Sequence, residues 1–134
     1  RELHLCDSIR FLGKQDAIEE LLAISDLFLM PSESESFGLS ALEAMACEVP
    51  VISSNAGGLS EVNIHGVTGY LSNIGDIEDM ANNALKILKD TVIHQQFREQ
   101  ALLQAQRFQL DNILPIYEEY YQEVIDTCVH VKNT

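Results

Sequence analysis

Residues 31–61 decide the fold and contain the candidate site; they read PSESESFGLSALEAMACEVPVISSNAGGLSE. The run just before them, Leu27–Met30, is four consecutive apolar residues, which is typical of an internal strand buried on both faces of a parallel sheet. Within the stretch, Gly38–Ala46 predicts a short helix and Val51–Ile52 a second buried strand. Ser54–Gly58 is rich in turn formers and predicts a loop. Strand, loop and helix therefore alternate, as in α/β proteins.

The flanking segments extend this pattern. On the N-terminal side, Ile9–Leu12 predicts a strand, Gly13–Lys14 a turn, and Asp16 the start of a helix. On the C-terminal side, Gly69–Leu71 predicts a last short strand. We therefore expect a Rossmann-like parallel sheet with flanking helices over residues 1–75, with four strands in this chain and one edge of the sheet missing.

Residues 76–134 predict three helices. Asp76 is a candidate N-cap for the first, and the others run from about Val92 to Phe108 and from about Ile113 to Val129. One face of the last helix is apolar and includes Tyr117, Tyr120 and Tyr121. This face is expected to pack on a core or on another domain, and otherwise to support a homodimer.

The composition limits the class of protein. The chain has 134 residues, of which 46% are hydrophobic, so it is one globular domain or less. It has no apolar run near the roughly 20 residues of a membrane span and no signal-peptide pattern. The three cysteines are far apart, which predicts neither a disulfide framework nor a zinc site. A cytoplasmic protein is expected, and a start at Arg1 suggests a piece of a longer chain.

The net charge of −13 argues against nucleic acid or an anionic membrane as partner. Gln15–Leu85 contains no Lys or Arg and twelve acidic residues. An anion bound in this region must therefore be held by backbone N–H groups or by cations from elsewhere.

Glu35 and Glu43 bracket the predicted helix start at Gly38. The N–H groups of Gly38 and Leu39 could meet phosphate or sugar oxygens, since the first amides of a helix lack partners within it. Each carboxylate could accept hydrogen bonds from a pair of hydroxyls. The pattern suits a ligand with sugars on both sides of a phosphate, although the spacing alone is often coincidental in a chain with 21 acids.

These residues resemble the retaining GT-B glycosyltransferases of family 4, the glycosyl transferases group 1, which include glycogen synthase and sucrose synthase. The resemblance covers about residues 9–90 and rests on several motifs in order: Phe11–Gly13, Glu35–Glu43 with seven residues between the acids, Ala44–Ala46, Val49–Ile52, Gly57–Gly58, Glu61, Gly66 and Thr68–Gly69. Within the family, FLGKQD and ALEAMA are similar to the bacterial, cytoplasmic enzymes that join N-acetylglucosamine to malate in bacillithiol synthesis.

The resemblance implies a role for each matched residue. Glu35 would position the donor sugar, and Glu43 would bind the ribose hydroxyls of the nucleotide. The amides of Phe37, Gly38 and Leu39 would reach the sugar and the diphosphate, and Gly13 and Lys14 would border the base. The implied reaction is sugar transfer with retained configuration. UDP-N-acetylglucosamine is the favoured donor and L-malate the favoured acceptor.

No metal or other cofactor is implied, in keeping with the lack of a ligand pattern among His4, His65, His94 and His130. His65 is expected to be a surface loop residue and Cys47 a packing residue.

The chain departs from the family pattern in two ways. Glu48 stands where a Gly is usual, at a position that favours a left-handed backbone. The Arg and Lys that neutralise the diphosphate would precede Ile9 and have no counterpart here, and the N-terminal acceptor domain is also missing. The resemblance therefore implies part of a C-terminal donor-binding domain that is inactive alone. A UDP-sugar epimerase of the same architecture and a non-catalytic interaction module remain alternatives.

Overall fold

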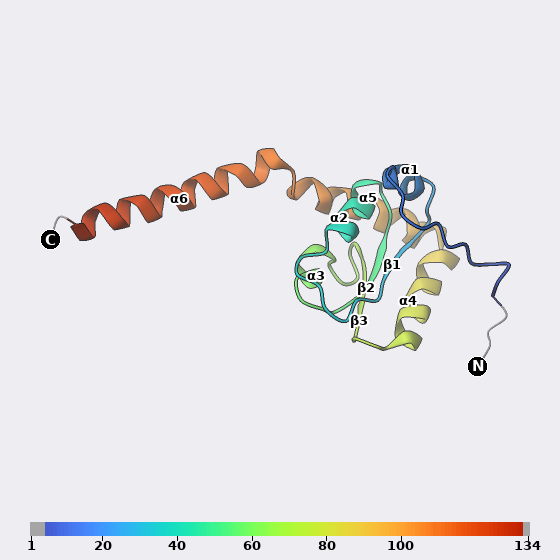
Figure 1. Ribbon diagram of the computed structural model, residues 1–134. Coiled ribbons are helices and arrows are strands. Elements are labelled where there is room, and N and C mark those ends of the chain that lie inside the picture. The colour runs from blue at the N-terminus through green and yellow to red at the C-terminus, as the bar shows by residue number, and fades with distance from the viewer. Residues whose placement is uncertain (1–4, 133–134) are drawn as a thin grey trace.

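The computed structural model describes residues 5–132, with side chains described to Cys128. Its sheet has three parallel strands, β1 (Phe28–Met30), β2 (Val51–Ser54) and β3 (Gly69–Ser72), in the order β1-β2-β3. Phe28 pairs with Val51 across the first ladder, and Val51 pairs with Gly69 across the second. The prediction of a parallel α/β fold is confirmed (Figure 1).

Six helices accompany the sheet in the described residues: α1 (Ile18–Ala23), α2 (Leu39–Ala46), α3 (Leu59–Val62), α4 (Ile77–Lys89), α5 (Thr91–Arg107) and α6 (Leu110–Lys132). The short helix α3 begins directly after the predicted loop Ser54–Gly58 and was not predicted, whereas α2, α4 and α5 follow the sequence closely. Asp76 caps α4 as predicted, since its side chain accepts a hydrogen bond of 3.0 Å from the Asp79 N–H.

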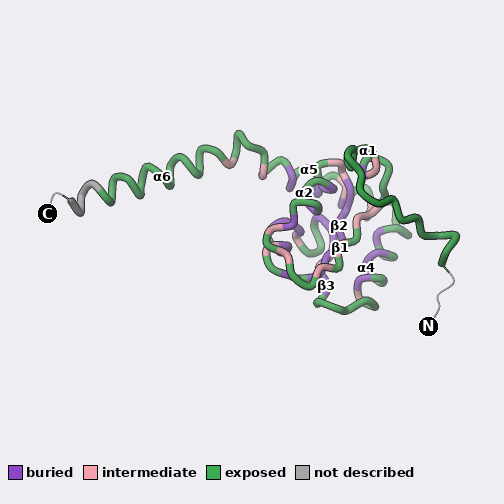
Figure 2. The backbone as a smooth tube through the Cα atoms, viewed as in Figure 1, coloured by how far each residue is buried: buried purple, intermediate pink, exposed green. Residues whose placement is uncertain are grey.

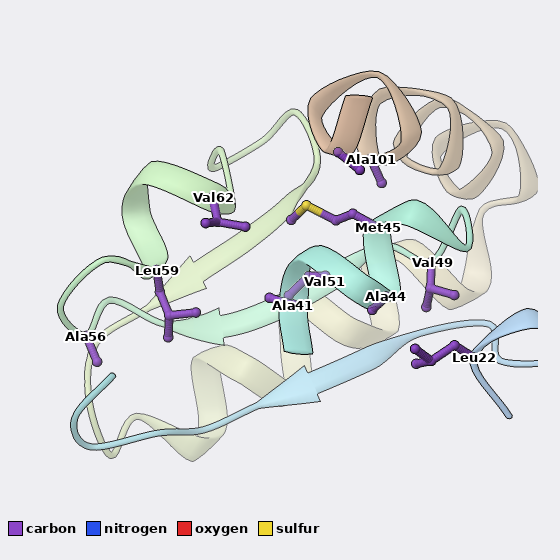
Figure 3. Packing of buried hydrophobic residues seen from close by; sticks show 11 residues of the cluster. Leu22, Ala41, Ala44, Met45, Val49, Val51, Ala56, Leu59, Val62 and Ala101 are labelled. Atoms are coloured by element: carbon purple, nitrogen blue, oxygen red, sulfur yellow. The ribbon is translucent and has the colours of Figure 1, made fainter. Parts of the chain in front are cut away.

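Two hydrophobic clusters cover the two faces of the sheet, because successive residues of a strand point to opposite sides. Val51 contributes to a cluster that contains residues of α1, α2, α3 and the second half of α5 (Figure 3). Ile52 contributes to the other, with α4 and Phe97 of α5. The central strand β2 is therefore buried on both sides, and α2 is fixed firmly against the sheet.

The structure corrects the prediction for the N-terminal segment. Ile9–Leu12 is not a strand, and the Phe11 side chain is 95% exposed. A strand needs a neighbour to pair with, and no strand of the described sheet lies beside this segment. The sheet of the described residues accordingly has three strands instead of four.

The structure also corrects the prediction for residues 27–30. Their strand begins at Phe28 and lies at the edge of the described sheet, not inside it. Leu29 is 56% exposed, so helices do not fully cover its face of the strand. The apolar run indicated the strand correctly, but an internal place in the sheet requires a paired strand on each side, and in the described residues β1 pairs only with β2.

The helix α6 projects from the compact part of the protein (Figure 1). Its predicted apolar face is largely exposed (Figure 2), and Tyr117, Tyr120 and Tyr121 are 57–62% accessible. No described helix packs on this face, so the expected domain contact or homodimer stays a prediction.

Candidate functional site

The candidate site begins at Gly38, the residue that joins the loop after β1 to helix α2. Its φ of 97° lies in the left-handed region, which disfavours residues with a side chain. A Cβ at this position would also lie 2.6 Å from Leu59 Cδ2 of α3. Both the backbone conformation and the neighbouring helix therefore require glycine here.

The first turn of α2 leaves its amides available. No side chain caps this end, and the first turn carries no acidic residue. The first helical hydrogen bond runs from Leu42 N to Gly38 O at 3.1 Å, so the N–H groups of Leu39, Ser40 and Ala41 precede it. Leu39 is 65% exposed, which places this turn at the surface. Such a helix start is suited to an anion or to sugar oxygens.

Glu43 lies on the same exposed face of α2 as Leu39, because residues four apart share a helix face. The opposite face is anchored by Ala41, Ala44 and Met45, each fully buried. The Glu43 carboxylate has no partner among the described residues and remains free to accept hydrogen bonds from a ligand.

Glu35 belongs to the loop before α2 and is half-buried. Its Oε1 accepts a hydrogen bond of 3.1 Å from the Ser36 N–H. Its backbone oxygen accepts one of 3.2 Å from the Gly58 N–H, which lies in the loop after β2. The position of Glu35 thus depends on contacts between two loops, unlike that of Glu43.

The Phe37 side chain packs inward. Its ring meets the ring of Phe108 edge-on, with centroids 5.6 Å apart and planes at 75°. Phe37 can therefore contribute to a ligand site only through its backbone, which is the role that the sequence predicted for it.

Ser54, the last residue of β2, and Gly57 and Gly58 after it contact the Glu35 loop and were not predicted to do so. The Ser54 hydroxyl donates a hydrogen bond to the Ser32 backbone oxygen. A Cβ on Gly57 would collide with the Glu35 oxygen, and one on Gly58 would lie 2.5 Å from the Ser36 oxygen. The adjacent glycines Gly57 and Gly58 are a sequence signal that another backbone segment can approach closely. Nothing in the sequence indicated that Ser54 contacts the Glu35 loop.

Gly13 and Lys14 lie in the segment before α1 and have no regular secondary structure. Lys14 is 92% exposed and forms a 4.0 Å ion pair with Asp16. Neither residue hydrogen-bonds to the Glu35 loop or to α2 in the part of the chain that the structure describes. Their assignment to a nucleotide base, like that of Glu35 and Glu43 to sugars, stays a prediction.

Glu48 has a left-handed backbone with φ of 60°, the conformation that is common just past a helix end. Its carboxylate forms a 3.2 Å ion pair with Arg98 of α5, so this turn is linked to a neighbouring helix. Cys47 is half-buried next to the core, and His65 is an exposed loop residue whose Nδ1 accepts a hydrogen bond of 3.0 Å from Leu71 N.

The described residues contain no group of three His, Cys, Asp or Glu side chains that could hold a metal ion. His4 and the His130 side chain lie outside the described part. None of the helices in residues 5–132 combines the length and apolar character needed to cross a membrane.

Comparison with known proteins points to one family. The sequence profile described as "Glycosyl transferases group 1" matches residues 1–104. The chain is 47% identical over 126 residues to N-acetyl-alpha-D-glucosaminyl L-malate synthase of Bacillus anthracis, covering 93% of this chain and 33% of that enzyme.

Solved structures agree. The Anabaena protein HepE, crystallised in complex with UDP-glucose, superposes with a TM-score of 0.80 at 32% identity, over 89% of this chain and 33% of HepE. Sucrose-phosphate synthase from Thermosynechococcus elongatus superposes with a TM-score of 0.82 at 30% identity, over 92% of this chain and 32% of that protein. The chain thus spans about a third of the length of these relatives. With this sheet, this order of elements and this sequence similarity, the chain belongs to the glycosyl transferases group 1 and has the Rossmann-like architecture of GT-B glycosyltransferases.

Proposed function

We propose that this chain is the donor-binding part of a retaining glycosyltransferase that transfers N-acetylglucosamine from UDP-N-acetylglucosamine to L-malate. The observation that carries the proposal is the uncapped, exposed start of α2, which Glu35 and Glu43 flank along the sequence. The amides would receive the diphosphate, while Glu43 would accept hydrogen bonds from the ribose and Glu35 from the sugar.

The choice of donor and acceptor is supported by the 47% identity to a protein named N-acetyl-alpha-D-glucosaminyl L-malate synthase. The UDP-glucose complex of HepE supports a UDP-sugar as the donor class. The acceptor site would lie in the remaining part of the full-length protein, and this chain alone would be inactive. The proposal includes a cytoplasmic location, a place in bacillithiol synthesis and no requirement for a metal ion.

In the proposed reaction the chain's own groups bind and orient. The helix amides stabilise negative charge on the diphosphate as the sugar departs, since dipoles fixed before the reaction need no rearrangement. Glu35 holds the sugar hydroxyls and is not itself the nucleophile. The acceptor hydroxyl attacks the anomeric carbon from the face that the phosphate leaves, with its proton passing to the departing phosphate oxygen.

The test is a calorimetric titration of the full-length protein with UDP. Glu43→Ala is expected to weaken binding by at least about tenfold, since hydrogen bonds to a carboxylate are worth about 1.5–3 kcal/mol each. Glu20→Ala, on the exposed part of α1, is the matched control and should bind UDP normally. Undiminished binding by Glu43→Ala would contradict the assigned role of Glu43.

Two further measurements separate the alternatives. A non-catalytic module would show no UDP binding in the unmodified protein. An epimerase would invert carbon 2 of UDP-N-acetylglucosamine without an acceptor, whereas the proposed transferase requires L-malate for turnover and gives a product of unchanged anomeric configuration.

A further inference from the structure

The two carboxylates of the candidate site are held in different ways. Glu43 stands on a helix whose other face is fully buried, so its position follows from the hydrophobic core. Glu35 stands on an irregular loop between β1 and α2, and a loop has no helical hydrogen bonds to define its path. Contacts from outside the loop must therefore define where Glu35 lies.

Those contacts come from the last residue of β2 and from the loop that follows it. Ser54, the last residue of that strand, is 1% exposed and donates its hydroxyl hydrogen bond to the Ser32 oxygen, near the beginning of the loop. Gly58 N donates to the Glu35 oxygen itself at 3.2 Å. The loop after β2 is held in turn by a 2.7 Å hydrogen bond from Asn55 N to the Ser72 oxygen of β3. The Glu35 loop is thus hydrogen-bonded to the end of β2 and to the loop that follows it, and that second loop is hydrogen-bonded to β3.

We infer that Ser54 is a positioning residue for the donor sugar: through its hydrogen bond to Ser32 it holds the loop that carries Glu35. The inference rests on the proposed function, because Glu35 is taken to bind the sugar. If the inference is correct, Ser54 affects only the contribution of the sugar to donor affinity. The contribution of the nucleotide depends on α2 and Glu43 and does not depend on Ser54.

The neighbouring serine provides a matched control. Ser53 is 0% exposed and its hydroxyl accepts a 2.9 Å hydrogen bond from the Asn63 side chain, in a network that does not include the Glu35 loop. Ser53→Ala and Ser54→Ala each remove one buried hydroxyl from the same strand. Only the second should change the loop.

The experiment titrates the full-length protein with two probes, UDP and UDP-N-acetylglucosamine, by calorimetry. In Ser54→Ala, affinity for UDP-N-acetylglucosamine should fall by about threefold to tenfold, the effect of one lost hydrogen bond, while affinity for UDP is unchanged. Ser53→Ala should bind both probes normally. Ser54→Thr, which keeps the hydroxyl, should bind the sugar nucleotide more tightly than Ser54→Ala does.

Each other outcome overturns the inference. If Ser54→Ala binds both probes normally, or loses affinity for both equally, Ser54 does not position the sugar and the proposed function still stands. If the unmodified protein binds neither probe, the proposed function and the inference fail together. Should Ser54→Ala not fold, Gly58→Ala decides the matter, because it disturbs the same loop at the Ser36 oxygen and must show the same selective loss.

Discussion

The start of α2 differs from the starts of α4 and α5. Asp76 caps α4 through the Asp79 N–H, and Asp90 caps α5 through the N–H groups of Val92 and Ile93. At α2 a glycine in the left-handed region takes the capping position, and no side chain satisfies the amides. Of these three helices, α4 and α5 thus have a side chain that accepts hydrogen bonds from their first amides, whereas α2, like the shorter helices α1 and α3, does not.

The difference teaches how a region without cations can receive an anion. Gln15–Leu85 contains no Lys or Arg, and three of its acids are Glu35, Glu43 and Glu48. Within this region the attraction would come from the dipole and free amides of a helix start such as that of α2, which an aspartate at the capping position would neutralise. Three of the predictions below alter one of the compared helix starts, and the last alters the opposite end of α2.

The largest effect is expected from Gly38→Ala. The substitution combines a left-handed backbone with the contact to Leu59 Cδ2 at 2.6 Å, so the free energy of unfolding should fall by about 2–4 kcal/mol. Gly66→Ala is the control, because it has φ of 75° and no atom within 4 Å of the added Cβ; its loss should be about 1 kcal/mol. Urea denaturation followed by circular dichroism measures both, and equal losses would show that contact with α3 does not constrain the α2 start.

Ser40→Glu makes the first turn of α2 resemble that of α4, which contains Glu78 and Asp79. The exposed side chain should leave stability unchanged or slightly higher, while UDP affinity falls by about tenfold from charge repulsion with the diphosphate. Thr91→Glu adds the same charge to the first turn of α5 and should not affect UDP binding. Both variants are titrated with UDP. Equal affinities would show that the diphosphate does not bind at the start of α2.

Asp90→Ala removes the N-cap of α5 and so tests how much a capped helix start contributes to stability. Loss of the 2.9 Å and 3.1 Å hydrogen bonds to Val92 N and Ile93 N should lower the free energy of unfolding by about 1 kcal/mol. UDP affinity should be unaffected. Asp16→Ala, which removes a 97% exposed carboxylate, should change stability by less than about 0.5 kcal/mol. If the two variants have the same free energy of unfolding, the Asp90 cap does not measurably stabilise the protein.

The smallest effect is expected at the other end of α2. Glu48→Gly relieves a left-handed backbone at φ of 60° but removes the 3.2 Å ion pair with Arg98, so the two contributions should nearly cancel, within about 0.5 kcal/mol. A double-mutant cycle with Arg98→Ala separates them. A coupling energy of zero would mean that the ion pair does not compensate for the unusual backbone.

Local patterns in the sequence predicted most of the helices and the parallel character of the sheet. Asp76 was identified as a cap because an acidic first turn and an apolar stripe follow it, and both are properties of neighbouring residues. Glu48 has the left-handed backbone that is common just beyond a helix end. The candidate site at Gly38 was identified in the same way, from a strand, a glycine and a helix in succession.

The wrong predictions concern pairing and burial. Ile9–Leu12 is apolar apart from Arg10, and Leu27–Met30 is wholly apolar, yet the first is exposed coil and the second contains an edge strand. In the described residues only the second has a neighbouring strand to pair with. The short helix α3 was missed because Gly57–Gly58 indicated a turn and four helical residues carry little periodicity.

The sequence by itself determined where the helices start, which of them cap themselves, and which helix start combines glycine with flanking acids, because these properties depend on residues within a few positions of one another. The tertiary structure decided that Ser54 and Gly58 contact the Glu35 loop, that Phe37 faces Phe108, and that β1 lies at the sheet edge. Those contacts join residues about 20 to 70 positions apart, and such distant pairs meet only when the sheet and its helices pack together.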